Sequence, residues 1–197
     1  MYMESESRLR IAVICGSVRP GNYTAKAVAL VMAELAQQDV AADLIDPTEL
    51  DLPLPGQKGN KDAATQLQET VAAATGVIFA TPEYHGSFSS VTKLVIENLG
   101  FPSVLSGKPM ALLGVAAGSI GAIKSLEQLR GVCSHVGALV LPGSVSVAKV
   151  REQFDAEGNC LDPRVEDRIR MVPRALLDYL RRHLCPKLTL EAMAREE

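Results

Sequence analysis

Residues 11–24, IAVICGSVRPGNYT, join an apolar run to an alanine-rich segment through a loop that contains glycine and proline. We expect residues 9–15 to form a buried strand. Residues 22–37 should form a helix, because apolar side chains recur there at helical spacing. A strand, a polar loop and a helix in succession are the repeating unit of parallel α/β sheets. The stretch therefore predicts an α/β protein with a polar loop at the carboxyl end of its first strand.

The same alternation of apolar runs and helical patterns continues along the chain. Predicted strands are residues 9–15, 41–45, 77–81, 110–115 and 137–141; predicted helices are residues 22–37, 63–74, 87–99, 121–134 and 163–184. Gly76 should end the second helix, and Pro173 should start a new turn or kink the last one. The strands are continuous apolar runs, as in sheets covered on both faces. We expect a three-layer α/β/α fold with a five-stranded parallel sheet.

Composition limits the class of protein. With 197 residues, the chain fits one domain, residues 1–197, in which residues 1–8 and 186–197 should be flexible or lie in oligomer contacts. The net charge of −3 argues against a nucleic-acid partner. No apolar run could span a bilayer and no signal core is present, so we expect a cytoplasmic protein without a membrane partner. The four cysteines lack the spacing of a zinc site or a disulfide framework.

The first loop is a candidate anion site, since ligands of such sheets bind beyond the carboxyl ends of the strands. Amides at a helix N-terminus suit a phosphate, and Ser17, Asn22 and Thr24 could add hydrogen bonds. Arg19 supplies a charged fork that matches phosphate geometry. The loop matches neither the dinucleotide fingerprint nor the P-loop. An ordinary turn with Asn22 as the helix cap explains the same residues.

The loop after the third predicted strand, residues 81–87 or TPEYHGS, is a candidate for contact with a planar ligand. Proline and glycine fix an irregular backbone there, and Tyr84 or His85 could lie against a ring. The alternative is a strand-to-helix turn with a packed tyrosine. Neither a histidine nor a cysteine stands at ligand spacing from His85, so we expect no metal site.

GSVRPGNYT followed by TPEYHGSFSSVTKLVIE resembles the NADPH-dependent FMN reductase family. The resemblance implies a flavodoxin-like sheet with strand order 2-1-3-4-5 and a bound FMN. It also implies cofactor contacts from two segments: Ser17, Arg19, Asn22, Tyr23 and Thr24 around the phosphate; Pro82, Glu83, Tyr84, His85, Gly86 and Ser87 beside the isoalloxazine ring. The chain departs from the family pattern with His85 in place of Asn and with Ser89-Ser90 in place of Pro-Gly.

The loop after the fourth strand, residues 115–121, resembles the family segment that meets the pyrimidine edge of the flavin. Gly118 and Ser119 are the expected contacts, because a helix N-terminus stabilises negative charge on a reduced flavin. An ordinary turn with Ser119 as a helix cap is the alternative.

The implied activity is hydride transfer from NADPH or NADH, through FMN, to a small electron acceptor in a ping-pong cycle. The acceptor could be free flavin, a quinone, an azo or nitro compound, or a metal oxyanion. No side chain need act as acid or base, so we name no catalytic residue. The resemblance also implies a homodimer or homotetramer. The alternatives are a flavodoxin-type electron carrier without NAD(P)H oxidation, which the modest net charge and Arg19 disfavour, and a module that has lost its flavin.

Overall fold

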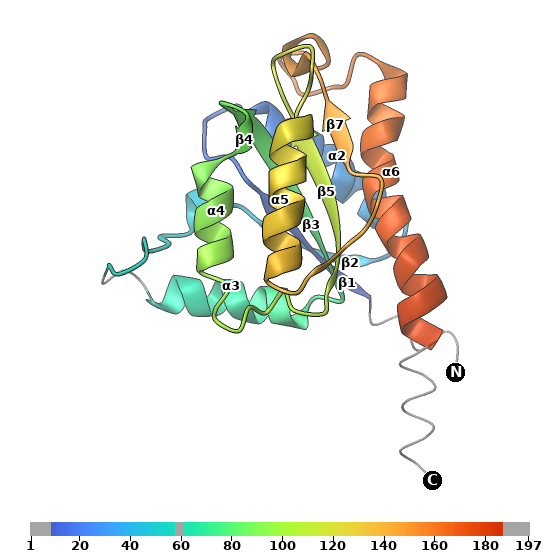
Figure 1. Cartoon of the computed structure of the whole chain (residues 1–197). Coiled ribbons are helices and arrows are strands. Elements are labelled where there is room, and N and C mark those ends of the chain that lie inside the picture. Colours follow the sequence, from blue (N-terminus) through green and yellow to red (C-terminus); the bar gives the residue numbers. More distant parts are fainter. Residues whose placement is uncertain (1–8, 58–60, 187–197) are drawn as a thin grey trace.

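The computed structural model describes residues 9–57 and 61–186 (Figure 1). The strands are β1 (Arg10–Cys15), β2 (Ala41–Ile45), β3 (Gly76–Tyr84), β4 (Ser87–Phe88), β5 (Pro109–Val115), β6 (Leu139–Val140) and β7 (Val145–Val147). The helices are α2 (Tyr23–Gln37), α3 (Lys61–Ala73), α4 (Ser90–Glu97), α5 (Ile123–His135) and α6 (Pro163–Tyr179). Short 3₁₀ turns η1 (Pro47–Glu49) and η2 (Val150–Glu152) and a π-helical turn η3 (Leu180–Leu184) complete the described elements.

The sheet order β2-β1-β3-β5-β6 confirms the predicted order, with parallel pairing throughout this path. Where one strand over residues 137–141 was predicted, two short strands share the last position beside β5. β6 pairs with Pro109–Met110, and β7 pairs with Leu113–Val115. Pro142 and Gly143 interrupt the strand between them, because Pro lacks the amide donor and Gly143 has φ +80°.

Alternate strand residues face opposite helical layers, which confirms the three-layer fold. Ile11 and Val13 point toward α2 and α6, whereas Ala12 and Ile14 point toward α3, α4 and α5. Figure 1 shows α4 and α5 in front of the sheet and α2 behind it. Phe79 is fully buried on the α3–α5 side. Each layer removes a continuous apolar face from water, so the sheet is covered on both sides.

Two predicted boundaries are wrong. Gly76 does not end a helix: it opens β3, where a Cβ would lie 3.2 Å from Leu180. The third strand continues to Tyr84 and turns back into β4, so the helix predicted from residue 87 begins at Ser90. The last helix, predicted over residues 163–184, does continue through Pro173: α6 runs to Tyr179 and η3 follows it to Leu184.

Among the described helices, none combines the length and apolar character that crossing a bilayer requires. The predictions for residues 1–8, and for the tail beyond residue 186, lie outside the described residues.

Candidate functional site

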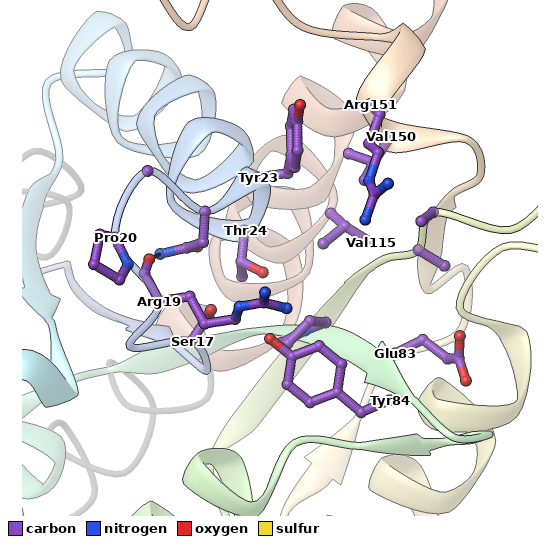
Figure 2. Close-up of a pocket in the computed structure, with 15 residues that line it drawn as sticks. Ser17, Arg19, Pro20, Tyr23, Thr24, Glu83, Tyr84, Val115, Val150 and Arg151 are labelled. Atoms are coloured by element: carbon purple, nitrogen blue, oxygen red, sulfur yellow. Dashed lines mark hydrogen bonds between the residues drawn. The ribbon is translucent and has the colours of Figure 1, made fainter. Parts of the chain in front are cut away.

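An open cavity of about 360 Å³ lies where the carboxyl end of β3 meets the segments that follow β1, β5 and β7. Its volume falls in the range of small-molecule and cofactor sites, about 300–1,000 Å³. Figure 2 shows its lining, which comprises Ser17, Arg19, Pro20, Gly21, Asn22, Tyr23, Thr24, Pro82, Glu83, Tyr84, Val115, Ala116, Ala117, Val150 and Arg151. The cavity is therefore at the carboxyl edge of the sheet, as the topology requires.

The first loop presents unused donors at the N-terminus of α2. Ser17 is 3% exposed, and its Oγ has no hydrogen-bond partner within the described structure. Thr24, in the first turn of α2, is buried as well. The first turn of α2 carries no acidic residue, so the positive end of its dipole is not neutralised by a side chain of the helix itself. A buried hydroxyl without a partner is costly unless a ligand satisfies it.

Asn22 has a structural role in this loop. Its Oδ1 accepts a hydrogen bond from the Ala25 amide at 2.7 Å, and its Nδ2 donates to the Arg19 carbonyl at 2.8 Å. Asn22 is therefore the cap of α2, as the alternative interpretation of the sequence held. The cap closes the loop and leaves the Arg19 side chain exposed, extending across the cavity toward Tyr84 (Figure 2).

Cys15 lies beneath the loop, and its thiol is unreactive. Burial raises the pKa of its thiol to about 11, more than the hydrogen bond to the Ser17 carbonyl lowers it. The thiol is consequently protonated at neutral pH and donates to that carbonyl at 3.8 Å. Cys15 packs as a small apolar residue and does not act as a nucleophile.

The second predicted loop is a hairpin that only partly faces the cavity. Tyr84 pairs with Ser87 across the two-residue turn His85-Gly86, whose φ values are +52° and +80°. Two successive positive φ angles are typical of a type I′ turn, and histidine tolerates this region better than most side chains. Pro82, Glu83 and Tyr84 line the cavity, but His85, Gly86 and Ser87 are not part of its lining.

The hairpin is fixed from its outer side by α5. Ser87 Oγ donates to Gln128 Oε1 at 2.8 Å, and Gln128 Nε2 donates to the Gly86 carbonyl at 3.0 Å. Glu83 accepts a hydrogen bond from the Gly86 amide. Ser87 therefore positions the hairpin, and one Glu83 oxygen is occupied by the turn.

A buried hydroxyl cluster, Thr81, Ser89 and Thr92, connects the two loops. Ser89 Oγ donates to the Gly16 carbonyl at 2.5 Å and lies 3.0 Å from Thr92 Oγ1, which in turn donates to Thr81 Oγ1 at 3.1 Å. All three side chains are at most 1% exposed. Ser89, which departs from the Pro-Gly of the family pattern, thus holds the first loop against the hairpin.

The loop after β5 contributes Ala116 and Ala117 to the lining, but Gly118 and Ser119 are not part of it. The Gly118 carbonyl accepts from the Lys149 amide at 3.0 Å. Ser119 does not cap α5 either, because the N-cap is Ala122 and it has no side-chain hydrogen bond. Sequence patterns missed Val150 and Arg151, which η2 brings to the opposite wall.

The profile of the NADPH-dependent FMN reductase family matches residues 9–152. This chain belongs to that family.

Individual members of the NADPH-dependent FMN reductase family align along most of the chain. The 2-hydroxy-1,4-benzoquinone reductase of a Burkholderia species is 34% identical over 77% of this chain and 85% of its own length. The NAD(P)H-dependent FMN reductase PA1204 of Pseudomonas aeruginosa is 31% identical, over 88% and 96%. The structure of FerB, an NAD(P)H:acceptor oxidoreductase from Paracoccus denitrificans, superposes with a TM-score of 0.70 at 20% identity and covers 89% of this chain and 98% of FerB.

The donor set of the cavity fits the FMN of an NADPH-dependent FMN reductase. The Ser17 hydroxyl without a partner, the Arg19 guanidinium and the N-terminus of α2 offer the hydrogen-bond donors and the positive charge that bind a phosphate monoester. Pro82, Tyr84 and the two alanines after β5 form less polar walls suited to a ring. Eight of the thirteen predicted contact residues line the cavity; the other five, His85, Gly86, Ser87, Gly118 and Ser119, do not.

Proposed function

We propose that this protein binds FMN in the cavity and oxidises NADPH or NADH to reduce a small electron acceptor. The observation that carries the proposal is the partnerless, buried Ser17 Oγ beside Arg19 and the N-terminus of α2. Family membership favours a reductase over a flavodoxin-type carrier.

In this proposal, Ser17, Arg19, Thr24 and the first amides of α2 bind the phosphate. When bound there, FMN would supply the redox chemistry that links oxidation of the nicotinamide to reduction of the acceptor. The hairpin holds Tyr84 at the cavity wall, and its anchoring to Gln128 keeps that wall in place. The open side of the cavity admits the nicotinamide and the acceptor in turn, as a ping-pong cycle requires.

The acceptor belongs to the class of small oxidants that two-electron flavin chemistry can reduce. A quinone is the first candidate, since one relative is named for a benzoquinone. Free flavin, azo or nitro compounds and metal oxyanions remain the other candidates.

We further propose that residues 1–197 form one FMN-binding domain and that the protein is a homodimer or homotetramer. The fully exposed Phe101 and the 72% exposed Ile120 are suited to a subunit contact. A cytoplasmic location stays a prediction.

Adding NADPH to the purified protein in the absence of oxygen tests the proposal. We expect a yellow protein whose visible flavin absorbance bleaches promptly and returns when a quinone is added. A yellow protein that stays oxidised in NADPH would support the electron carrier instead. A colourless protein that takes up no added FMN would contradict both flavin functions.

Replacing Arg19 with alanine should weaken FMN binding about 10- to 100-fold, the value of one charge-assisted hydrogen bond of roughly 1.5–3 kcal/mol. Riboflavin, which lacks the phosphate, should bind as it does to the wild type. Arg19 is exposed, so the thermal unfolding temperature should not change. Equilibrium dialysis against each flavin gives the affinities. Arg182→Ala removes an equal charge from the far end of the last helix and is the matched control. Unchanged FMN affinity in Arg19→Ala would refute the role of Arg19.

A further inference from the structure

Arg151 is the second arginine that lines the cavity, and its place there was not predicted from the sequence. It lies in η2, the next element after β7, and its side chain is exposed at the cavity wall. Figure 2 shows the guanidinium of Arg151 directed into the cavity from the wall opposite Arg19. Two cations far apart in the sequence thus face one volume.

The backbone that carries Arg151 is fixed on its sheet side. The Lys149 amide donates to the Gly118 carbonyl at 3.0 Å, and the Val150 amide donates to the Ala116 carbonyl at 2.9 Å. Val150 is 4% exposed. Lys149 adopts a left-handed φ of +47°, a conformation that costs free energy in a non-glycine residue and turns the chain toward the cavity.

The segment that follows Arg151 is fixed on the side of α2. Phe154 is buried and packs against Tyr23, with ring centroids 6.4 Å apart. Lys26 Nζ donates to the Asp155 carbonyl at 2.5 Å. Tyr23 and Lys26 belong to the first turns of α2, so Arg151 is held beside the helix end that forms the proposed phosphate site.

The Arg151 guanidinium has no internal partner that explains its position. Over residues 9–57 and 61–186, no hydrogen bond or ion pair involves this side chain, and neighbouring Glu152 lies 3.8 Å from Lys149 instead. Ser17 Oγ, buried in the same cavity, also has no partner within those residues. An unpaired cation and an unpaired buried hydroxyl in one cavity indicate an anionic ligand between them.

We propose that Arg151 binds the phosphate of FMN opposite Arg19, so that the two arginines hold the phosphate from both sides. The proposal rests on the proposed function, since it assumes FMN in this cavity. A phosphate monoester carries roughly 1.5 to 2 negative charges at neutral pH. Arg19 and the end of α2 together supply about 1.5 positive charges, and Arg151 raises the sum above the charge of the phosphate. Two cations would therefore allow tight retention of the dianion.

The test compares Arg151→Ala, Arg151→Lys and the control Arg182→Ala by equilibrium dialysis of the full chain against FMN and against riboflavin. We expect Arg151→Ala to weaken FMN binding about 10- to 100-fold and to leave riboflavin binding unchanged. Arg151→Lys keeps the charge without the planar fork and should lose less FMN affinity than the alanine variant. With saturating FMN, the KM values for NADPH and NADH should keep their wild-type ratio.

Three results would overturn the inference. If the FMN affinity of Arg151→Ala equals that of the wild type, Arg151 does not contact the phosphate. If FMN and riboflavin lose affinity equally, the substitution has changed the shape of the cavity rather than phosphate binding. A rise in KM for NADPH alone would place Arg151 on the 2′-phosphate of the nicotinamide cofactor. Failure of the proposed function is distinguishable, because the wild type itself would then bind no FMN and oxidise no NADPH.

Discussion

Gly16→Val should lower the free energy of unfolding by about 3 kcal/mol or more and abolish FMN retention, because this position has no room for a side chain. A Cβ at Gly16 would lie 2.1 Å from Thr92 Oγ1 and 2.7 Å from the Ala80 carbonyl. The carbonyl belongs to β3 and already accepts the Gly16 amide at 2.7 Å. Neither neighbour can move without breaking the hydroxyl cluster or the sheet, so the loop that carries Ser17 and Arg19 must shift.

Urea unfolding of Gly16→Val and its FMN content on purification measure this effect. Gly118→Val is the matched control for stability, since a Cβ there meets nothing within 4 Å and the substitution should change the free energy by about 0.5 kcal/mol or less. A double-mutant cycle separates the two contacts. In a Gly16→Ala background, Thr92→Ala should destabilise less than it does in the wild type. Wild-type stability of Gly16→Val would contradict the packing argument.

Arg174→Ala should lower the free energy of unfolding by about 2 kcal/mol at neutral pH, because it leaves the Glu34 carboxylate buried with a weaker partner. Glu34 lies on α2 and is 1% exposed. Its oxygens accept from Arg174 Nε at 2.7 Å and Arg174 Nη2 at 3.0 Å, which connects α2 to α6. Arg170 Nη1, at 3.6 Å, would remain nearby and limit the loss. The exposed pair Arg182–Asp178 is the control, and its loss should cost about 0.5 kcal/mol or less.

The stability difference between the wild type and Arg174→Ala should depend on pH. The hydrogen bonds from Arg174 lower the pKa of Glu34 from the ordinary 4.5, outweighing burial, which raises it. A lowered pKa in the folded state contributes stability above the unfolded pKa, and that contribution is lost as the pH falls through the folded pKa. The difference should therefore be largest at neutral pH and should shrink below pH 4.5. A difference that stays constant across this range would contradict the ion-pair account.

The order of the sheet and its two helical layers could be predicted because burial dictates them locally. Each central strand, such as Ile11–Ile14, is apolar at every position, which only a sheet covered on both faces requires. The predicted ends of helices and strands were wrong where tertiary contacts determine them. Gly76 looked like a helix stop, but the close approach of Leu176 and Leu180 explains it as the start of β3. Equally, the signal for a hairpin, His85-Gly86, was present in the sequence and was missed.

The candidate site could be predicted where one loop provides its own chemistry. Ser17, Arg19 and Thr24 follow one strand and open one helix, so their convergence on the cavity is local. Arg151 stands more than 120 residues further along the chain, as the numbering shows, and it reaches the site only because β7 lies beside β5. The spacing of residues in the sequence does not predict the pairing of β7 with β5.

The sequence by itself determined that a parallel sheet is covered on both faces, and that a helix follows a loop that contains a serine and an arginine. These follow from apolar runs and from the helical spacing of apolar side chains. Only the tertiary structure decided that Ser17 Oγ is buried without a hydrogen-bond partner and that Ser89 Oγ donates to the Gly16 carbonyl. It also decided that Arg151 faces Arg19 across the cavity (Figure 2). The physical reason is that burial and cross-chain hydrogen bonds depend on which strand ends meet, and a local pattern does not encode that.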